Sequence, residues 1–155
     1  MKLLAALPVL LPVAHALFCE DFQLRVVNSD DSGLVCKSVD YPGYYIIDYL
    51  GGRGEFFHFG DDNMLVDSDQ VSLIVSDSGE VRGAFPSEVA TQGFFFDNKH
   101  LKPQSNVDFY ACKLEQPRIY SLQVGYKKGC TKVELGKTRL IRRKPIRYSC
   151  ERCNC

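Results

Sequence analysis

The placement of seven cysteines behind an apolar leader constrains the fold of this 155-residue chain more than any other feature of its sequence. The leader predicts export, and exported cysteines usually oxidise to disulfides rather than bind metal ions. The sequence therefore predicts a cross-linked extracellular module. The disulfide candidates are Cys19, Cys36, Cys112, Cys130, Cys150, Cys153 and Cys155.

The leader itself has the three parts of a secretory signal peptide. Lys2 provides a positive charge, residues 3–13 are almost wholly apolar, and Ala14-His15-Ala16 places small residues where signal peptidase needs them. We expect cleavage after Ala16, which makes 1–16 the signal peptide. No later segment approaches the ~20 apolar residues of a membrane-spanning helix, so we expect a secreted protein without a transmembrane segment.

The number of cysteines is odd, so one thiol is free, capped or bonded to another molecule. Their spacing does not choose a pairing. A bridge between Cys36 and Cys112 would close a long loop and, in the chain-entropy description, stabilise the fold by ~4 kcal/mol. An intermolecular disulfide through the odd cysteine would link the chain to a partner.

Charge is divided unevenly along the chain, although the net charge is zero. Residues 17–126 carry 8 Lys or Arg against 17 Asp or Glu, whereas residues 127–155 carry 10 against 2. The basic segment either folds back on the acidic body or binds an anionic partner such as a phosphorylated glycan or a membrane surface. Nucleic acid is not expected as the partner of an exported protein. The anion-binding candidates are Arg139, Arg142, Arg143, Lys144, Arg147 and Arg152.

Period-two alternation of apolar and polar residues recurs along the body and predicts strands. Residues 22–26 give one such pattern. Residues 71–75 and 81–85 give two more, and the turn sequence between them places Gly79 where positive φ is needed. About nine or ten short strands separated by such turns are typical of an all-β fold, here an antiparallel β-sandwich or barrel-like domain.

These patterns divide the mature chain into two parts. Residues 17–136 form one β-rich, disulfide-stabilised domain, and residues 137–155 form a basic tail that contains cysteines. The 139 residues after the leader suffice for one hydrophobic core but not for two.

Tyrosines gather near a predicted turn at residues 41–49. Tyrosine rings stack on sugar faces while their hydroxyls form hydrogen bonds, although tyrosine is also an ordinary strand residue. The possible glycan-contacting residues are Tyr41, Tyr44, Tyr45 and Tyr49. This cluster predicts contact with a polysaccharide.

The histidines and cysteines match no catalytic motif, so we expect no enzyme activity and no cofactor. His58 alternates with phenylalanines, as a half-buried structural histidine does, and His100 stands in no recognisable signature. Cys112 is a poor nucleophile candidate, because oxidation in an exported chain would consume its thiol.

Acidic and cysteine clusters also favour structural roles over metal binding or catalysis. Asp61 with Asp62, and Asp67 with Asp69, lie among turn-forming residues, which favours solvated turns over glycosidase carboxylates or a calcium loop. The three C-terminal cysteines lack a fourth local zinc ligand, so disulfides are favoured there. We therefore expect no metal site.

Three segments around Cys112 and Cys130 resemble a known group of proteins. These segments are Phe109-Tyr110-Ala111-Cys112, Ile119-Tyr120-Ser121-Leu122 and Gly129-Cys130-Thr131-Lys132-Val133-Glu134-Leu135. The likeness is to the C-terminal four-cysteine domain of PIR-type cell wall mannoproteins of yeasts and other ascomycetes, and a looser likeness extends upstream to Cys36. A weaker similarity joins the chain to phiA-type secreted cell wall proteins of filamentous fungi.

The resemblance implies a non-catalytic structural protein of the fungal cell wall. Disulfides and non-covalent contacts would hold it to wall polysaccharide or to other wall proteins. The glutamine-rich repeats through which the PIR group attaches to β-1,3-glucan are missing here, so covalent ester attachment is not expected. The alternative is a secreted cysteine-rich effector, or a glycan-binding protein, that acts on a host or competitor through a binding surface.

Overall fold

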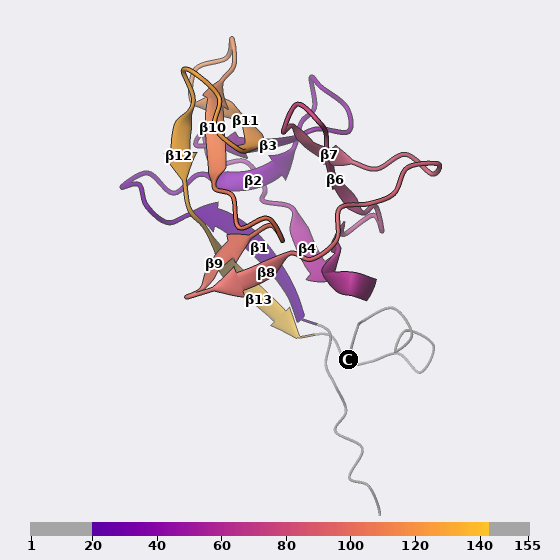
Figure 1. Cartoon of the computed structure of the whole chain (residues 1–155). Helices are drawn as coiled ribbons and strands as arrows, with labels where there is room; N and C mark the ends of the chain where they lie inside the picture. The colour runs from indigo at the N-terminus through magenta and orange to yellow at the C-terminus, as the bar shows by residue number, and fades with distance from the viewer. Residues whose placement is uncertain (1–19, 143–155) are drawn as a thin grey trace, which may run out of the picture.

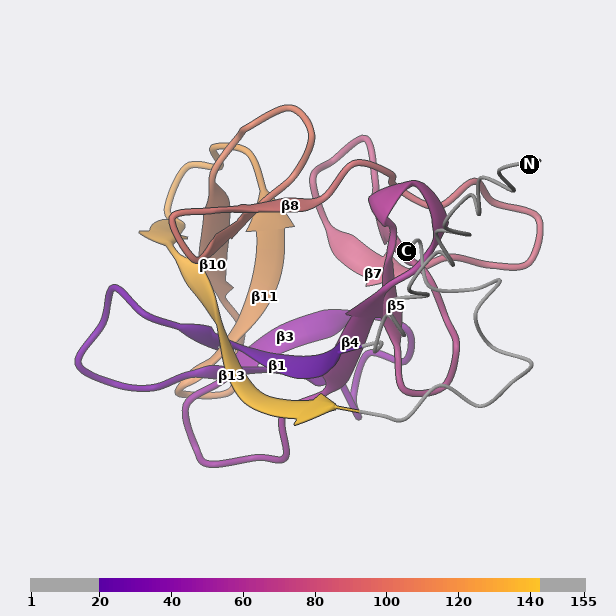
Figure 2. The same ribbon diagram turned by 90° about the horizontal axis from the view of Figure 1, so that it is seen from below.

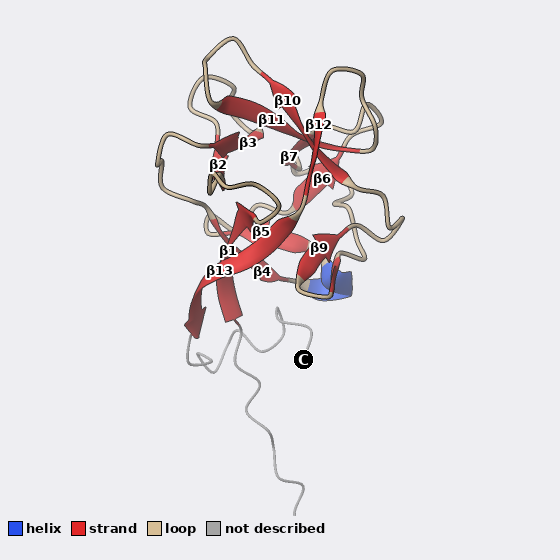
Figure 3. Ribbon diagram, turned by 90° about the vertical axis from the view of Figure 1, so that its left-hand side faces the viewer, coloured by secondary structure: helices blue, strands red, loops and turns tan. Residues whose placement is uncertain are grey.

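The computed structural model describes residues 20–142, which form thirteen β-strands and one short 3₁₀ turn (Figure 1). No α-helix occurs among these residues, and Figure 3 shows the 3₁₀ turn in blue against strands and loops. The all-β class predicted from the alternating sequence is confirmed. It follows from the sequence because the apolar residues recur with the period of a strand and not with that of a helix.

The strands are mostly short. They are β1 (Glu20–Val26), β2 (Leu34–Lys37), β3 (Tyr45–Asp48), β4 (Phe56–Phe59), β5 (Leu65–Asp67), β6 (Leu73–Val75), β7 (Val81–Gly83), β8 (Phe95–Asp97), β9 (His100–Lys102), β10 (Phe109–Lys113), β11 (Ile119–Val124), β12 (Thr131–Val133) and β13 (Leu135–Arg142), and the 3₁₀ turn η1 (Asp61–Asn63) precedes β5.

Eleven of these strands form one antiparallel sheet that curls into a half-barrel. The order along its main path is β12-β10-β11-β3-β2-β1-β13-β9-β8, and β4 pairs with both β1 and β5 beside that path. Figure 2 shows the curl, with β1 and β13 on one side and β10 and β11 on the other. The hairpin of β6 and β7 forms a separate small sheet, which isolated bridges from Arg82 to Tyr44 and from Glu80 to Gln123 attach to the half-barrel.

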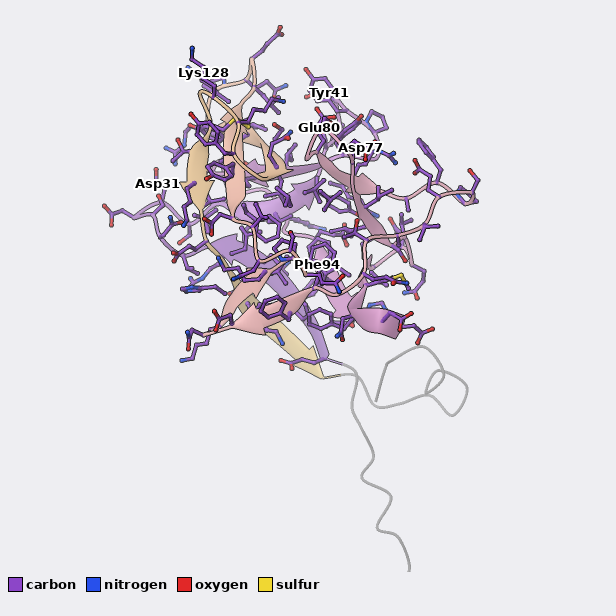
Figure 4. All side chains as sticks on the ribbon, in the orientation of Figure 1. Asp31, Tyr41, Asp77, Glu80, Phe94 and Lys128 are labelled. Carbon is purple, nitrogen blue, oxygen red and sulfur yellow. A yellow bond between two sulfur atoms is a disulfide. The ribbon has the colours of Figure 1, made fainter. Side chains whose placement is uncertain are left out.

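The hydrophobic core lies inside the curl of the sheet. Because successive side chains of a strand point to opposite faces, β1 sends Phe22, Leu24 and Val26 into the interior, as its sequence predicts. Phe94, from the loop before β8, is also buried and lies near the centre of the molecule in Figure 4. Each such side chain stabilises the fold by roughly 1.5–3 kcal/mol when it leaves water, so burial fixes which face of each strand points inward.

The predicted hairpin at residues 71–85 is present as β6 and β7. Gly79 adopts φ +86° in its turn, where an L side chain would be strained. The Gly79 amide and carbonyl both form backbone hydrogen bonds, and a Cβ at this position would collide with the carbonyl oxygen of Val124. Glycine is therefore required here both by the turn and by the close approach of β11.

The last strand extends past the expected end of the domain. β13 runs to Arg142 and pairs with β1 along the whole length of that strand. Residues 137–142, which the charge pattern assigns to the basic tail, therefore belong to the sheet, because pairing with β1 determines where the strand ends. Arg139 and Arg142 thus lie in β13. The other anion-binding candidates, Arg143, Lys144, Arg147 and Arg152, lie outside the described residues.

One disulfide lies within the described residues and joins Cys112 to Cys130, with their Cα atoms 4.3 Å apart. Cys112 is on β10, and Cys130 immediately precedes β12, the neighbour of β10 in the sheet. Ala111 pairs with Thr131, so in this antiparallel pair the next residue of β10, Cys112, lies opposite Cys130. The candidates Cys19, Cys150, Cys153 and Cys155 lie outside the described residues.

Cys36 does not form the long-range bridge that would close a loop to Cys112. Cys36 is a buried free thiol among the described residues. Strand register explains this, because Cys36 pairs with Ile46, Ile46 with Ser121 and Ser121 with Cys112. Three strand spacings therefore separate the two cysteines, on the order of 14 Å, whereas a disulfide requires Cα atoms within about 7 Å.

Candidate functional site

The four tyrosines proposed as one sugar-binding cluster are separated by the fold. Tyr45 is buried in the core, and its hydroxyl donates a hydrogen bond to Asp67 at 2.6 Å, so its assignment to a glycan surface is wrong. It alternates on β3 with Ile46, and the curl of the sheet places its ring inside. Tyr44 is partly exposed and bridges to Arg82, while Tyr41 and Tyr49 line two different hollows.

Tyr41 lies beside a groove of about 500 Å³, between the β2–β3 loop and the β10–β11 loop. Its side chain is about half exposed, and Figure 4 shows it at the upper edge of the molecule. The floor of the groove is apolar and contains Ile46, Leu114 and Ile119. A groove of this size with an apolar floor and an exposed ring on its rim has the proportions of a small-ligand site.

Polar side chains surround this apolar floor. The Gln116 amide donates a hydrogen bond to the Asp40 carboxylate at 2.6 Å, which ties the two loops together across the groove. The Asp48 carboxylate accepts a hydrogen bond from the Leu50 amide at 2.6 Å through one oxygen. Arg53 adds exposed donors on the same rim. The groove therefore presents both hydrogen-bond donors and acceptors around a surface on which an apolar ligand face can rest.

Sequence reasoning missed Arg53 and Gln116 as members of this site. They come from two loops that are far apart in the chain, and neither loop carries a motif. The exposed tyrosine beside a turn was the available signal, and it located one wall of the groove. The opposite wall depends on the pairing of β3 with β11, which no local pattern reveals.

The Cys36 thiol also faces this groove but is poorly suited to act as a nucleophile. Burial raises the pKa of Cys36 to about 11, and the nearby carboxylates of Asp48 and Glu55 contribute to the rise. The thiol donates a hydrogen bond to the Leu34 carbonyl at 3.5 Å. At neutral pH the side chain is therefore an uncharged, protonated thiol in the groove floor.

We expect Cys36 to react slowly with iodoacetamide while the protein is folded. The raised pKa lowers the thiolate fraction at pH 8 by about 100-fold relative to an ordinary thiol, and burial slows access further. Site-resolved mass spectrometry of the Cys36 peptide, with and without urea, measures this protection. Labelling of the native protein at the rate seen in urea would contradict it.

Asp67 is not the solvated turn residue that its neighbours in the sequence predicted. Its side chain is completely buried, and one oxygen accepts hydrogen bonds from Tyr45 and from the Lys37 ammonium at 2.8 Å. Its other oxygen accepts the backbone amides of Asp69 and Val71, each at 2.9 Å. The carboxylate therefore holds the β5–β6 turn to the strands that carry Lys37 and Tyr45.

Ionisation of the Asp67 network is set by its hydrogen bonds. Burial alone would raise the pKa of Asp67, but the hydrogen bonds from Lys37, Tyr45 and the Val71 amide outweigh burial and lower it below its usual value. Burial lowers the pKa of Lys37, but its hydrogen bonds to Asp67 and Asp69 reverse the effect and raise it. Both groups are therefore charged across the physiological pH range, and the network is a structural ion pair.

Tyr49 lines a second, smaller hollow of about 340 Å³ between the loop after β1 and strands β11 and β12. Its ring meets that of Tyr120 edge to face, with centroids 5.5 Å apart. Arg118 donates to the Tyr49 carbonyl at 3.1 Å and reaches Asp31 at 3.4 Å. Tyr49 is thus half-buried against its neighbours, and Tyr41 offers the more exposed ring.

The remaining candidates lie where a structural role is expected. His58 is half-buried on β4, as the alternation with phenylalanine predicted, and its Nδ1 atom lies 3.9 Å from Asp21. Asp61 and Asp62 lie in the exposed 3₁₀ turn η1. Within the described part of the chain, no three histidine, cysteine, aspartate or glutamate side chains gather closely enough to hold a metal ion. No helix among residues 20–142 is long and apolar enough to cross a membrane.

Comparison with known proteins identifies no relative. No protein-family profile matches the chain, and no curated protein and no solved structure is detectably similar to it. The chemistry of the groove itself is therefore the evidence for its function.

Proposed function

We propose that this protein is a secreted, non-enzymatic component of a fungal cell wall that binds neutral wall polysaccharide in the Tyr41 groove. The observation that carries the proposal is the exposed Tyr41 ring beside an apolar floor, with hydrogen-bonding side chains around it. A sugar ring has the complementary surface, because its C–H face stacks on an aromatic ring while its hydroxyls need donors and acceptors at the edge.

The charges of the groove favour a neutral sugar over an anionic one. Asp40, Asp48 and Glu115 line the groove together with Lys37 and Arg53, so acidic and basic groups are mixed. The ammonium of Lys37 is held by Asp67 and Asp69. An anionic ligand would meet repulsion from the carboxylates, whereas sugar hydroxyls donate to them and accept from Arg53.

The wall location and the structural role are supported by other features of the chain. The leader predicts export, and the Cys112–Cys130 disulfide lies in the short segments on which the expected likeness to fungal wall proteins rests. A cross-linked, curled sheet suits a protein that must persist outside the cell. Release in the culture fluid, with none retained on walls, would instead favour the secreted effector.

Replacing Tyr41 with alanine is expected to weaken retention on insoluble β-glucan or chitin by roughly fivefold, which corresponds to the loss of about 1 kcal/mol of stacking. The exposed position of Tyr41 means that the variant should fold normally. A depletion isotherm with washed polysaccharide measures the affinity, and thermal unfolding checks the fold.

Tyr126→Ala is the matched control for this experiment, because Tyr126 is an exposed tyrosine in the β11–β12 loop, outside the groove. It should bind polysaccharide as the parent protein does. Equal retention of the parent and the Tyr41→Ala protein would refute the groove as the glycan site, and weaker retention of both variants would show non-specific adhesion through tyrosine.

A further inference from the structure

A cleft of about 490 Å³ beside β1, β9 and β13 is lined by residues that include four basic ones. Arg25 comes from β1, Lys99 from the β8–β9 turn, His100 from β9 and Lys137 from β13. These strands lie in the lower part of Figure 1, away from the β2–β3 loop that carries the Tyr41 groove. Three of these basic residues, Arg25, Lys99 and His100, come from residues 17–126, in which acidic residues outnumber basic ones.

Strand register produces the hollow. Arg25 pairs with Gly136, and Gly136 pairs with His100, so the three residues lie in one row across three strands. Paired residues of antiparallel strands point to the same side of the sheet, which places the side chains of Arg25 and His100 on either side of a residue that has none. A Cβ at Gly136 would come within 2.7 Å of the Val27 side chain, so glycine at this position lets Val27 pack closely against the middle of the row.

The positive charge of the cleft is only partly compensated. Among residues 20–142, no aspartate or glutamate lines it. At its margins, Glu134 lies 3.6 Å from His100 and Glu20 lies 3.7 Å from Lys137. The ammonium of Lys137 also sits 4.6 Å from the centre of the Phe96 ring. Arg25 and Lys99 form no ion pair with any residue in 20–142, so two full positive charges face the cleft without a counter-charge from the described chain.

Lys99 adopts a positive φ angle, a backbone conformation that is unfavourable for a residue with a side chain. Asn98 and Lys99 form the two-residue turn between β8 and β9, with φ +46° and φ +73°. Turns with two positive φ values favour glycine at the second position, because an L side chain there is strained. Strain of this kind is commonly found where a side chain has a functional role. A lysine at this position adds a second full positive charge to the cleft that Arg25 lines.

We propose that this cleft binds the phosphate group of a phosphorylated sugar residue in wall polysaccharide. The inference rests on the proposed wall function and adds a second, anionic specificity to it. Arginine and lysine donors match phosphate oxygens, and the charge–charge attraction is strongest for a doubly charged monoester. The volume lies within the ~300–1,000 Å³ of small-ligand sites and exceeds what a bare phosphate ion needs.

Titration of the full mature chain with glucose 6-phosphate, inorganic phosphate and glucose tests the proposal. Amide shifts of Lys99 and Gly136 in NMR spectra should report saturable binding of glucose 6-phosphate, weaker binding of inorganic phosphate and no response to glucose. Lys99→Gly should lower the affinity for glucose 6-phosphate about fivefold or more. The same variant should raise Tm by about 3 °C, because glycine relieves the strained turn. Arg25→Ala should lower the affinity similarly without raising Tm.

Lys128→Gly is the charge control, because Lys128 is an exposed lysine in the turn before Cys130, at the opposite end of the molecule in Figure 4. It should leave phosphate binding unchanged. Parent-like affinity in both cleft variants, an equal response to glucose, or inorganic phosphate binding as tightly as glucose 6-phosphate would each overturn the proposal. Lys99→Gly should still be retained on neutral glucan through Tyr41, so failure of one site is distinguishable from failure of the other.

Discussion

Replacing Asp67 with alanine is expected to destabilise the protein by about 3–5 kcal/mol, a large share of the stability of a domain this size. The change leaves the buried Tyr45 hydroxyl without its acceptor and removes the acceptor for the amides of Asp69 and Val71. Each buried donor left unsatisfied costs about 1–3 kcal/mol. Urea denaturation, with the midpoint compared at constant m-value, measures the loss.

Asp69→Ala provides the control for this prediction. Asp69 contacts the same Lys37 ammonium, but its side chain is largely exposed and no buried donor depends on it. It should change stability by less than about 0.5 kcal/mol. Similar midpoints for the two variants would mean that Asp67 acts as a surface charge and that its hydrogen bonds contribute little.

The same carboxylate should make stability depend on acid pH. The pKa of Asp67 is lower in the folded protein than its usual value of 3.8. Its stabilising contribution is therefore complete above that usual value and is lost as the pH falls through the lower, folded value. Asp67→Ala should flatten the acid limb of a plot of unfolding free energy against pH, and an unchanged slope would contradict this assignment.

Removing the Cys112–Cys130 disulfide by a double serine substitution is expected to cost about 3 kcal/mol. The bridge closes a loop of 17 intervening residues, and in the chain-entropy description a loop of this size restricts the unfolded chain by roughly that amount. β12 is an edge strand that pairs with β10 over only three residues, so we expect the loss of the bridge to affect this edge of the sheet most. Hydrogen exchange should therefore show loss of protection in β12 before the rest of the sheet.

Cys36→Ala distinguishes loss of the bridge from loss of a cysteine as such. Cys36 is buried but unbridged, so its truncation removes a small side chain and should cost about 1 kcal/mol. A double variant no less stable than Cys36→Ala would mean that the disulfide does not stabilise the folded protein.

The local part of the fold was predictable because it depends on patterns short enough to read along the sequence. The alternation in β1 predicts that Phe22, Leu24 and Val26 point into the core, and Gly79 marks a turn that only a residue tolerant of positive φ forms well. Both follow from the geometry of a single strand or hairpin.

Most features that could not be predicted from the sequence depend on pairing between strands that are distant in the chain. The choice of Cys130 over Cys36 as the partner of Cys112 depends on which strands are neighbours, and so does the end of β13. Asp67 looked solvated because its neighbours in the chain are polar, yet the partners that bury it come from β2 and β3. The same distinction between local patterns and distant strand pairing applies to the two candidate binding sites. Tyr41 was identified from a local turn, whereas the basic cleft depends on a row of residues from three strands.

The pairing of β1 with β13 also determines when folding can finish. Val26 meets Leu135, more than a hundred residues later in the chain, and the half-barrel remains open along this seam until β13 arrives. Closing so long a loop is slow, since its entropy is lost before the contacts that compensate for it form. A polypeptide that moves through a membrane pore from its amino end would therefore stay incompletely folded until almost all of it had emerged. An incompletely folded chain can still move through such a pore.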